Sequence, residues 1–213
     1  KAFAEVAPDL KNPIKKRDAW FQAGEAALRG EDFAAALRGF ERAVGMENAE
    51  VTPSLRLRLA EAFGLNGRWG DSARAARRFQ REFPEHELTG RAVYQEAWAL
   101  ENQGKHEEAI QRYRAWVDTG DKSPTAARCQ FQIGECLLAL ARTDAAIAAF
   151  MQTVVAHDVP EVRAPALLQL GETLRNAGRP GEAREWYQTL IKDYPDSSAA
   201  ELAREQIEST SPE

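Results

Sequence analysis

Few side chains in this sequence have the types and spacing that catalysis or metal binding requires. The histidines are His86, His106 and His157, and none lies three or four residues from another histidine or from a cysteine. A helical histidine–cysteine metal site is therefore not predicted. Cys129 and Cys136 are seven residues apart, which on one helix places their Cα atoms about 10 Å apart, too far for a disulfide. We expect both to be free thiols that serve as small core residues rather than nucleophiles.

Glutamates recur at three similar places in the chain, Glu25, Glu135 and Glu172. Paired carboxylates can act as acid and base, but one of them then needs a raised pKa in a dry pocket. On an open helical surface we expect them to form ion pairs with Arg128 or Arg175, or to remain solvated. The sequence contains neither a G-x-S-x-G elbow nor a phosphate-binding glycine loop. We therefore predict no enzymatic activity, no cofactor and no metal.

The charge distribution argues against nucleic acid and against a membrane span. Net charge is −5 and the pI is about 5.4, so the local basic stripe of Arg74, Arg77, Arg78 and Arg81 is interpreted as a solvated helix face. No apolar run approaches the roughly 20 residues that a transmembrane helix needs. Because the chain begins at Lys1, we expect a mature or trimmed fragment, attached to a membrane only if a removed signal segment carried a lipid anchor.

The chain consists largely of a repeat of about 37 residues. An alanine marks each copy, at Ala36, Ala73, Ala109, Ala146 and Ala183, with intervals of 37, 36, 37 and 37 residues. Twelve residues earlier stand Gly24, Glu61, Ala97, Gly134 and Gly171. Two antiparallel helices approach closely where both carry small side chains, so each copy predicts a helical hairpin. Because one hairpin cannot bury its own apolar face, the hairpins must stack.

The repeat resembles the tetratricopeptide repeat (TPR) family. In the fifth copy the matching residues are Leu167, Gly171, Leu174, Gly178, Ala183, Tyr187 and Pro195. The resemblance implies an all-α fold, a right-handed α-solenoid of five hairpins closed by a C-terminal capping helix. The five repeats are placed at about 18–50, 54–86, 90–122, 124–159 and 163–195, within residues 18–195. Residues 1–17 are expected to be an irregular lead-in with at most a short helical turn, and residues 196–213 the capping helix and tail.

Local signals support these hairpins, with one departure. Thr52-Pro53 and Ser123-Pro124 pair an N-cap residue with proline at the first helical position. The glycines expected at the hairpin turns are Gly30, Gly67, Gly104 and Gly178. The second copy departs from the pattern, because Glu61 occupies the small position and Arg77 the aromatic one. Phe79 and Phe83 are the candidates to replace that aromatic from a shifted register.

A narrower resemblance concerns the cellular compartment. The period near 37 and the sequence Asp193-Tyr194-Pro195-Asp196-Ser197 are similar to bacterial envelope TPR proteins, such as the Tol–Pal-associated periplasmic protein and the TPR lipoprotein of the outer-membrane β-barrel assembly machine. This resemblance implies a periplasmic or outer-membrane-associated adaptor. The alternative is a cytoplasmic TPR scaffold or the TPR portion of a larger regulatory protein, which free cysteines favour.

In this family the first helix of each hairpin lines a concave groove that takes a protein or peptide partner. The groove positions implied here, with their neighbours, are Phe21, Arg58, Arg91, Tyr94, Trp98, Arg128, Phe131, Glu135, Leu168, Glu172 and Arg175. Tyr94 and Trp98 are one helical turn apart and share a surface, and aromatic residues with arginine are typical of binding hot spots. Aromatic residues at helical spacing can equally be core. We nominate Tyr94 and Trp98 because they fall outside the core register of the other copies.

Overall fold

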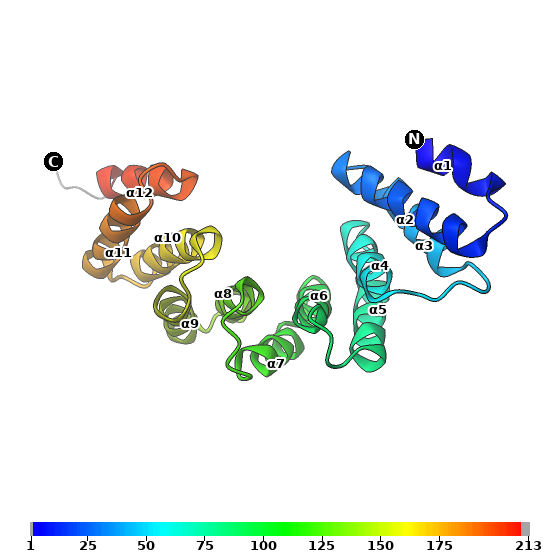
Figure 1. The fold of residues 1–213 in the computed structure, drawn as a ribbon. Coiled ribbons are helices and arrows are strands. Elements are labelled where there is room, and N and C mark those ends of the chain that lie inside the picture. The colour runs from blue at the N-terminus through cyan, green and yellow to red at the C-terminus, as the bar shows by residue number, and fades with distance from the viewer. Residues whose placement is uncertain (1, 210–213) are drawn as a thin grey trace. The chain divides into compact units, whose positions relative to one another are not determined.

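The computed structural model describes residues 2–209, and all regular structure in that range is helical (Figure 1). The elements are α1 (Ala2–Val6), the 3₁₀ helix η1 (Ala7–Asp9), α2 (Pro13–Arg29), α3 (Phe33–Val44), α4 (Pro53–Leu65), α5 (Trp69–Glu82), α6 (Thr89–Glu101), α7 (His106–Val117), α8 (Pro124–Ala139), α9 (Thr143–Ala156), α10 (Pro160–Asn176), α11 (Pro180–Asp193) and α12 (Ser198–Ser209). The prediction of an all-α fold is confirmed. Over the described residues, no helix is both long and apolar enough to cross a bilayer.

The chain divides into two compact units, residues 1–105 and residues 106–213. In the first unit α2 pairs with α3 and α4 with α5, while α6 packs on α5 and α4. In the second unit α8 pairs with α9 and α10 with α11, while α7 packs on α8 and α12 packs on α11 and α10. Paired, stacked helices are the architecture of a TPR-type α-solenoid, as the repeat predicted. The two helices expected for the third hairpin, α6 and α7, belong to different units.

Three hairpins are held together by an aromatic ring that lies directly on a glycine. The pairs are Gly24 with Phe40, Gly134 with Phe150 and Gly171 with Tyr187. A Cβ atom on any of these glycines would lie 2.3–2.6 Å from the nearest ring atom. All three rings are buried. The small position predicted from the repeat is therefore the place where the ring of the second helix meets the backbone of the first.

The second hairpin achieves its packing by other means. Gly64, three residues after Glu61, is a close approach of α4 to both neighbouring helices, because a Cβ atom there would lie 2.8 Å from the ring of Trp98 on α6 and 3.3 Å from Ser72 Oγ on α5. Phe79 is fully buried against Leu57 and Ala92. The ring centroid of Phe83 lies 5.3 Å from that of Phe79. The two phenylalanines thus supply the aromatic packing that Arg77 does not, as the shifted register predicted.

Arg77 itself forms an ion pair with the next helix. Its Nε atom donates to Glu96 Oε1 on α6 at 2.6 Å, and the Glu96 side chain is 1% exposed. Gln80 Nε2 donates to the other carboxylate oxygen at 2.9 Å. Interpreting Arg77 as part of a solvated stripe was therefore wrong, because its guanidinium balances a buried negative charge. Arg74 and Arg78 do remain at the surface, paired with Asp71 and Glu82.

The hairpin turns require one residue in the left-handed conformation. Gly67, Gly104 and Gly178 hold it with φ of +71°, +75° and +77°. Gly30 lies at the turn after α2, as predicted, but its φ is −95°, and the next residue, Glu31, holds the left-handed conformation with φ of +57°. In the fourth hairpin Ala141 does the same, with φ of +56°. Two of the five turns therefore have a residue other than glycine in the left-handed conformation, which only glycine adopts without steric strain.

This difference predicts opposite effects of exchanging glycine and alanine at equivalent turns. Both positions are free of close packing, since Ala141 is exposed and nothing lies within 4 Å of a Cβ atom on Gly178. Ala141→Gly should therefore stabilise the protein and Gly178→Ala destabilise it, each by about 1 kcal/mol, through backbone strain alone. Urea unfolding of the two variants checks this. Destabilisation by both exchanges would show that strain at φ > 0 does not control these turns.

The N-terminal residues are more regular than expected. α1 and η1 occupy residues 2–9, and α2 begins at Pro13, so describing residues 1–17 as irregular was wrong for most of that segment. Asn12 caps α2 by accepting from the Lys15 amide at 3.1 Å. The predicted caps Thr52 and Ser123 accept from the amides three residues later, at 3.3 and 3.4 Å.

The last helix closes the second unit. α12 buries Ala199, Ala200 and Ala203 against α11 and α10. Ser197 joins it to the preceding loop, because its Oγ donates to the Tyr194 carbonyl at 2.8 Å and accepts from the Ala200 amide at 3.1 Å. The prediction of a capping helix after Pro195 is confirmed.

Both cysteines lie on α8 as free, fully buried thiols. Burial raises the pKa of Cys129 to about 12, with a smaller contribution from the negative charge of Asp121. Because the thiolate is the reactive form, native protein should react slowly with a thiol reagent. After denaturation it should titrate two thiols per chain. Rapid labelling of native protein would contradict this, and a peptide map would show which cysteine is accessible.

Candidate functional site

The first unit contains a cleft of about 230 Å³ on the side of its first helices. It is lined by Phe21, Glu25, Ser54, Leu57, Arg58, Glu87, Leu88 and Arg91. These residues come from α2, α4, the loop before α6 and the start of α6. Phe21, Arg58 and Arg91 were predicted as groove residues from the sequence. The structure brings these three to one cleft.

The cleft is held by a chain of ion pairs from helix to helix. Arg58 Nε on α4 lies 2.8 Å from Glu25 Oε1 on α2, and Arg58 Nη1 lies 2.8 Å from Glu61 Oε2. Arg91 Nη2 on α6 then lies 2.6 Å from Glu61 Oε1. Three first helices are thus linked by alternating charges. Burial opposes the charge of Arg58, but the hydrogen bonds and charges of Glu61 and Glu25 outweigh it and raise the pKa of its guanidinium.

An apolar surface adjoins these charges. The ring centroid of Phe21 lies 5.7 Å from that of Phe40, so one face of Phe21 packs on the hairpin while part of its side chain remains accessible. Leu57 is buried beneath the cleft and Leu88 is half-buried at its edge. A bound segment could place an apolar side chain against Phe21. A polar group next to that side chain could then form hydrogen bonds with Arg58 or Glu25.

Tyr94 and Trp98 follow Arg91 along α6, and both are half-buried. Trp98 packs edge-on against Trp69 of α5, with ring centroids 4.9 Å apart, and its ring closes on Gly64 of α4. Trp98 therefore also packs between helices. As half-buried side chains, Tyr94 and Trp98 both stay predicted groove residues.

The remaining predicted groove residues lie on α8 and α10 of the second unit. Phe131 packs on Phe150 with ring centroids 5.6 Å apart, as Phe21 does on Phe40. Arg128 is exposed, Glu135 is half-buried and Leu168 is buried. Glu172 lines a separate cleft of about 190 Å³. Arg175 donates to Gln206 of α12, so it connects the capping helix to its neighbour.

One of the three recurring glutamates, Glu25, forms its ion pair with an arginine other than those expected. Glu25 pairs with Arg58, 33 residues away, instead of with Arg128 or Arg175. Glu61 was noted only as a departure from the small position, yet it links Arg58 to Arg91. The signal that could have revealed it is the charge itself. A glutamate at a position that is glycine or alanine elsewhere in the repeat calls for a nearby cation.

No group of three or more histidine, cysteine or acidic side chains suitable for a metal ion occurs within residues 2–209. His157 is a buried histidine that follows the last residue of α9. It is 6% exposed, and its Nδ1 atom is buried without a hydrogen bond. Burial lowers the pKa of His157, Lys122 lowers it further, and Asp121 opposes the shift.

This shift predicts an acid-sensitive second unit. Because the folded pKa of His157 lies below that of the unfolded chain, the unfolded state binds the proton more readily. Stability should therefore fall as pH drops through the ordinary histidine range, about 6.5. His157→Gln should lose less of its thermal stability between neutral and mildly acidic pH than the unsubstituted protein does. Equal acid losses in the two proteins would exclude His157 as the cause.

Comparisons with known proteins agree with the repeat and the hairpins. A tetratricopeptide repeat family model matches residues 21–87, 57–127 and 131–198, which together make up most of the chain. The class of protein that the hairpins and this match define is thus a helical-repeat scaffold. The chain belongs to the tetratricopeptide repeat family. No curated protein sequence matches it significantly.

Solved TPR structures are similar in fold at low sequence identity. MamA (residues 41 to the end) from Desulfovibrio magneticus RS-1 is 17% identical, with a TM-score of 0.66 over 85% of this chain and 97% of that one. YrrB, described as a TPR protein with an unusual peptide-binding site, is 16% identical, with a TM-score of 0.59 over 96% and 98%. The apo form of RapI is 14% identical, with a TM-score of 0.78 over 96% of this chain and 61% of that one.

Proposed function

We propose that this chain is a non-enzymatic scaffold that captures a protein or peptide on its first-helix side, at the cleft around Phe21, Arg58 and Arg91. The observation that carries the proposal is the combination of an accessible apolar surface with the linked charges from Glu25 to Arg91. A cleft of this kind selects an extended segment with an apolar residue beside a polar or charged one. YrrB, a structural neighbour, is described as having a peptide-binding site, which supports this reading.

The proposal extends to the other predicted groove residues. Tyr94 on α6, and Arg128, Phe131, Glu135, Leu168, Glu172 and Arg175 on α8 and α10, would continue the contact with a longer partner within each unit. Those that also pack between helices, such as Phe131, would contribute only their accessible edges. The cleft of the first unit therefore remains the principal site to test.

Substitution in the cleft, with a matched control elsewhere, tests this function. Purified protein serves as bait in extracts of the source organism, and the captured proteins are identified by mass spectrometry. Arg58→Ala combined with Arg91→Ala should lose the specific partners. Arg74→Ala combined with Arg78→Ala, which removes two exposed arginines from α5, should retain them. If the cleft variant captured the same partners in the same amounts while remaining folded, the cleft would not be the binding site.

We further propose a bacterial envelope location, periplasmic or outer-membrane-associated. Its support is the 37-residue period and the sequence from Asp193 to Ser197. Fractionation of the source cells, with an antibody to the protein, checks the location. Recovery with the cytoplasmic fraction would favour the alternative, a cytoplasmic scaffold or the TPR portion of a regulatory protein.

A further inference from the structure

The second unit exposes an uncharged helix face that nothing in residues 106–209 covers. In that unit α7, α9 and α11 lie along one side, with α8 and α10 on the other (Figure 1). The middle helix, α9, has no charged residue in the twelve positions from Ala145 to Ala156. Each of the other second helices, α3, α5, α7 and α11, carries several charges. The exposed side of α9 is therefore distinct among equivalent surfaces.

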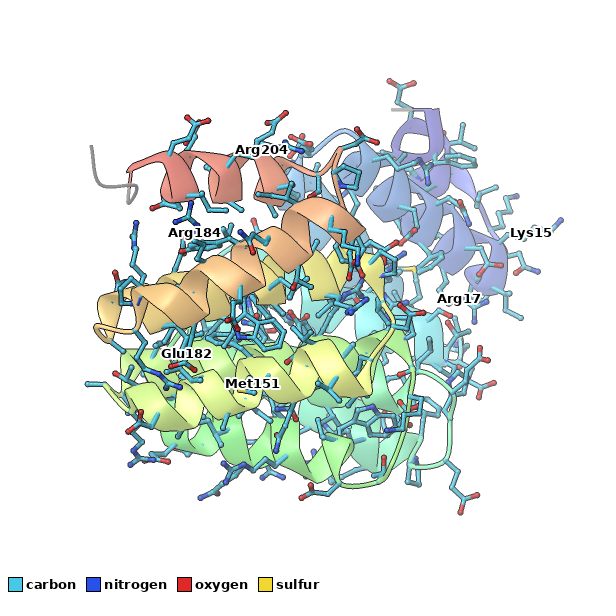
Figure 2. The ribbon with its side chains drawn as sticks, turned by 90° about the vertical axis from the view of Figure 1, so that its left-hand side faces the viewer. Lys15, Arg17, Met151, Glu182, Arg184 and Arg204 are labelled. Atoms are coloured by element: carbon cyan, nitrogen blue, oxygen red, sulfur yellow. The ribbon has the colours of Figure 1, made fainter. Side chains whose placement is uncertain are left out.

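Large apolar side chains are exposed on this face. Met151 is 41% exposed and Val155 is 80% exposed, and they lie one helical turn apart. Ala148 and Gln152, also exposed, extend the same surface around the helix. Figure 2 views this side of the unit and labels Met151 on α9. A contiguous apolar surface of this kind marks an interaction site in a soluble protein.

A groove adjoins the α9 face. It has a volume of about 300 Å³, and its floor is formed by residues of α8, including Ile133 and Leu137. Ala145, Ala148 and Gln152 form its wall on α9, and Arg114 and Asp118 form the wall on the side of α7. The small side chains on α9 allow a second helix to approach closely, and the groove gives that helix a place to lie.

The charges on the flanking helices indicate which partner fits. The exposed acidic residues Glu107 and Glu108 lie at the start of α7, and the exposed Arg114 lies toward its end. α11 carries both signs at each end, with the exposed Glu182, Arg184 and Glu185 near its start and the exposed Lys192 and Asp193 at its end. A two-fold axis across the middle of α9 would set α9 antiparallel to its counterpart in a second copy. It would also bring the acidic start of α7 toward the basic end of α7 in the copy.

We propose that this face binds a second copy of the chain, with α9 packed antiparallel against α9 of the copy. Two copies of an uncharged surface can associate favourably, because no charged group is desolvated when they come into contact. The charges of α7 complement those of α7 in the copy in this antiparallel arrangement. This association does not involve the first-helix cleft of the proposed function, so the two proposals can be tested independently.

The first test measures mass in solution by light scattering after size exclusion. The unsubstituted protein should have twice the chain mass of 23.7 kDa and dissociate on dilution. Met151→Glu should be a monomer with unchanged helicity, because the side chain is at the surface. Leu202→Glu places the same charge at a site of similar exposure, 45%, on α12, and should remain a dimer. A monomeric unsubstituted protein at every concentration, or a dimeric Met151→Glu, would overturn the proposal.

The second test maps the contact by cross-linking. Single cysteines at Ala148, Met151, Gln152 and Val155 should form disulfides between copies under mild oxidation. An antiparallel pair gives its highest yield at the position nearest the two-fold axis, with lower yields on both sides. The native cysteines do not compete, since both are buried. A cysteine at Glu201 on α12 is the matched exposed control. Equal yields at Glu201 and on α9 would show random collision instead of a defined interface.

Discussion

Arg77→Ala should lower the free energy of unfolding by about 3 kcal/mol, the largest effect we expect from a single substitution outside an aromatic core residue. The change removes the guanidinium that balances the Glu96 carboxylate, which is 1% exposed. Gln80 still donates one hydrogen bond to that carboxylate, but an amide does not neutralise its charge. Because Arg77 is itself 41% exposed, water can partly replace it, which places the loss at the lower end of the range for broken buried ion pairs. Equilibrium unfolding in urea measures this loss.

The adjacent arginine provides the control. Arg78 pairs with Glu82 at the surface, with side chains 56% and 32% exposed, so Arg78→Ala should cost only about 0.5 kcal/mol. Adding Glu96→Gln to Arg77→Ala removes the buried charge and should recover part of the loss. If the two arginine variants unfolded at the same urea concentration, Arg77 would contribute no more than a surface residue.

Gly171→Ala should destabilise the second unit by about 2 kcal/mol, although alanine is the better helix former by about 1 kcal/mol. The added Cβ would lie 2.3 Å from a ring carbon of Tyr187. That ring is 2% exposed and is confined by its neighbours, so it cannot move aside without disturbing the hairpin. Thermal unfolding followed by circular dichroism measures the effect.

Gly181→Ala makes the same chemical change at a place with space for it. Nothing lies within 4 Å of a Cβ atom on Gly181, so this variant should be slightly more stable than the unsubstituted protein. Combining Gly171→Ala with Tyr187→Leu should recover part of the loss by giving the methyl group room. Similar melting of the Gly171 and Gly181 variants would show that the ring does not constrain the helix at Gly171.

The repeat register predicted most of the backbone architecture. Three of the glycines that it marks, Gly24, Gly134 and Gly171, meet aromatic rings in the structure, because two helices pack closely where a small residue on one faces a ring on the other. Gly30 lies at the turn after α2, where the sequence predicted it. Glycine composition suggests a turn but does not fix which residue takes positive φ, and there Glu31 takes it.

The candidate site was predicted only in part. Phe21, Arg58 and Arg91 converge because the repeat puts them on neighbouring first helices. The packing of Trp98 against Trp69 was not predicted, since it depends on how α6 crosses α5, and sequence spacing carries no information about that crossing. The pairing of Glu61 with two arginines was missed for the same reason.

Arg77 and Glu96 together fix the order in which hairpins can follow one another. At the place of Arg77 the other copies have Phe40, Tyr113, Phe150 and Tyr187, and at the place of Glu96 they have Ala23, Ala60, Ile133 and Leu170. Each residue alone departs from the repeat, and each is compensated by the other across the junction between α5 and α6. An array in which the two residues were separated would leave the Glu96 carboxylate buried against an apolar neighbour, so the second hairpin and the helix that follows it form a single structural block.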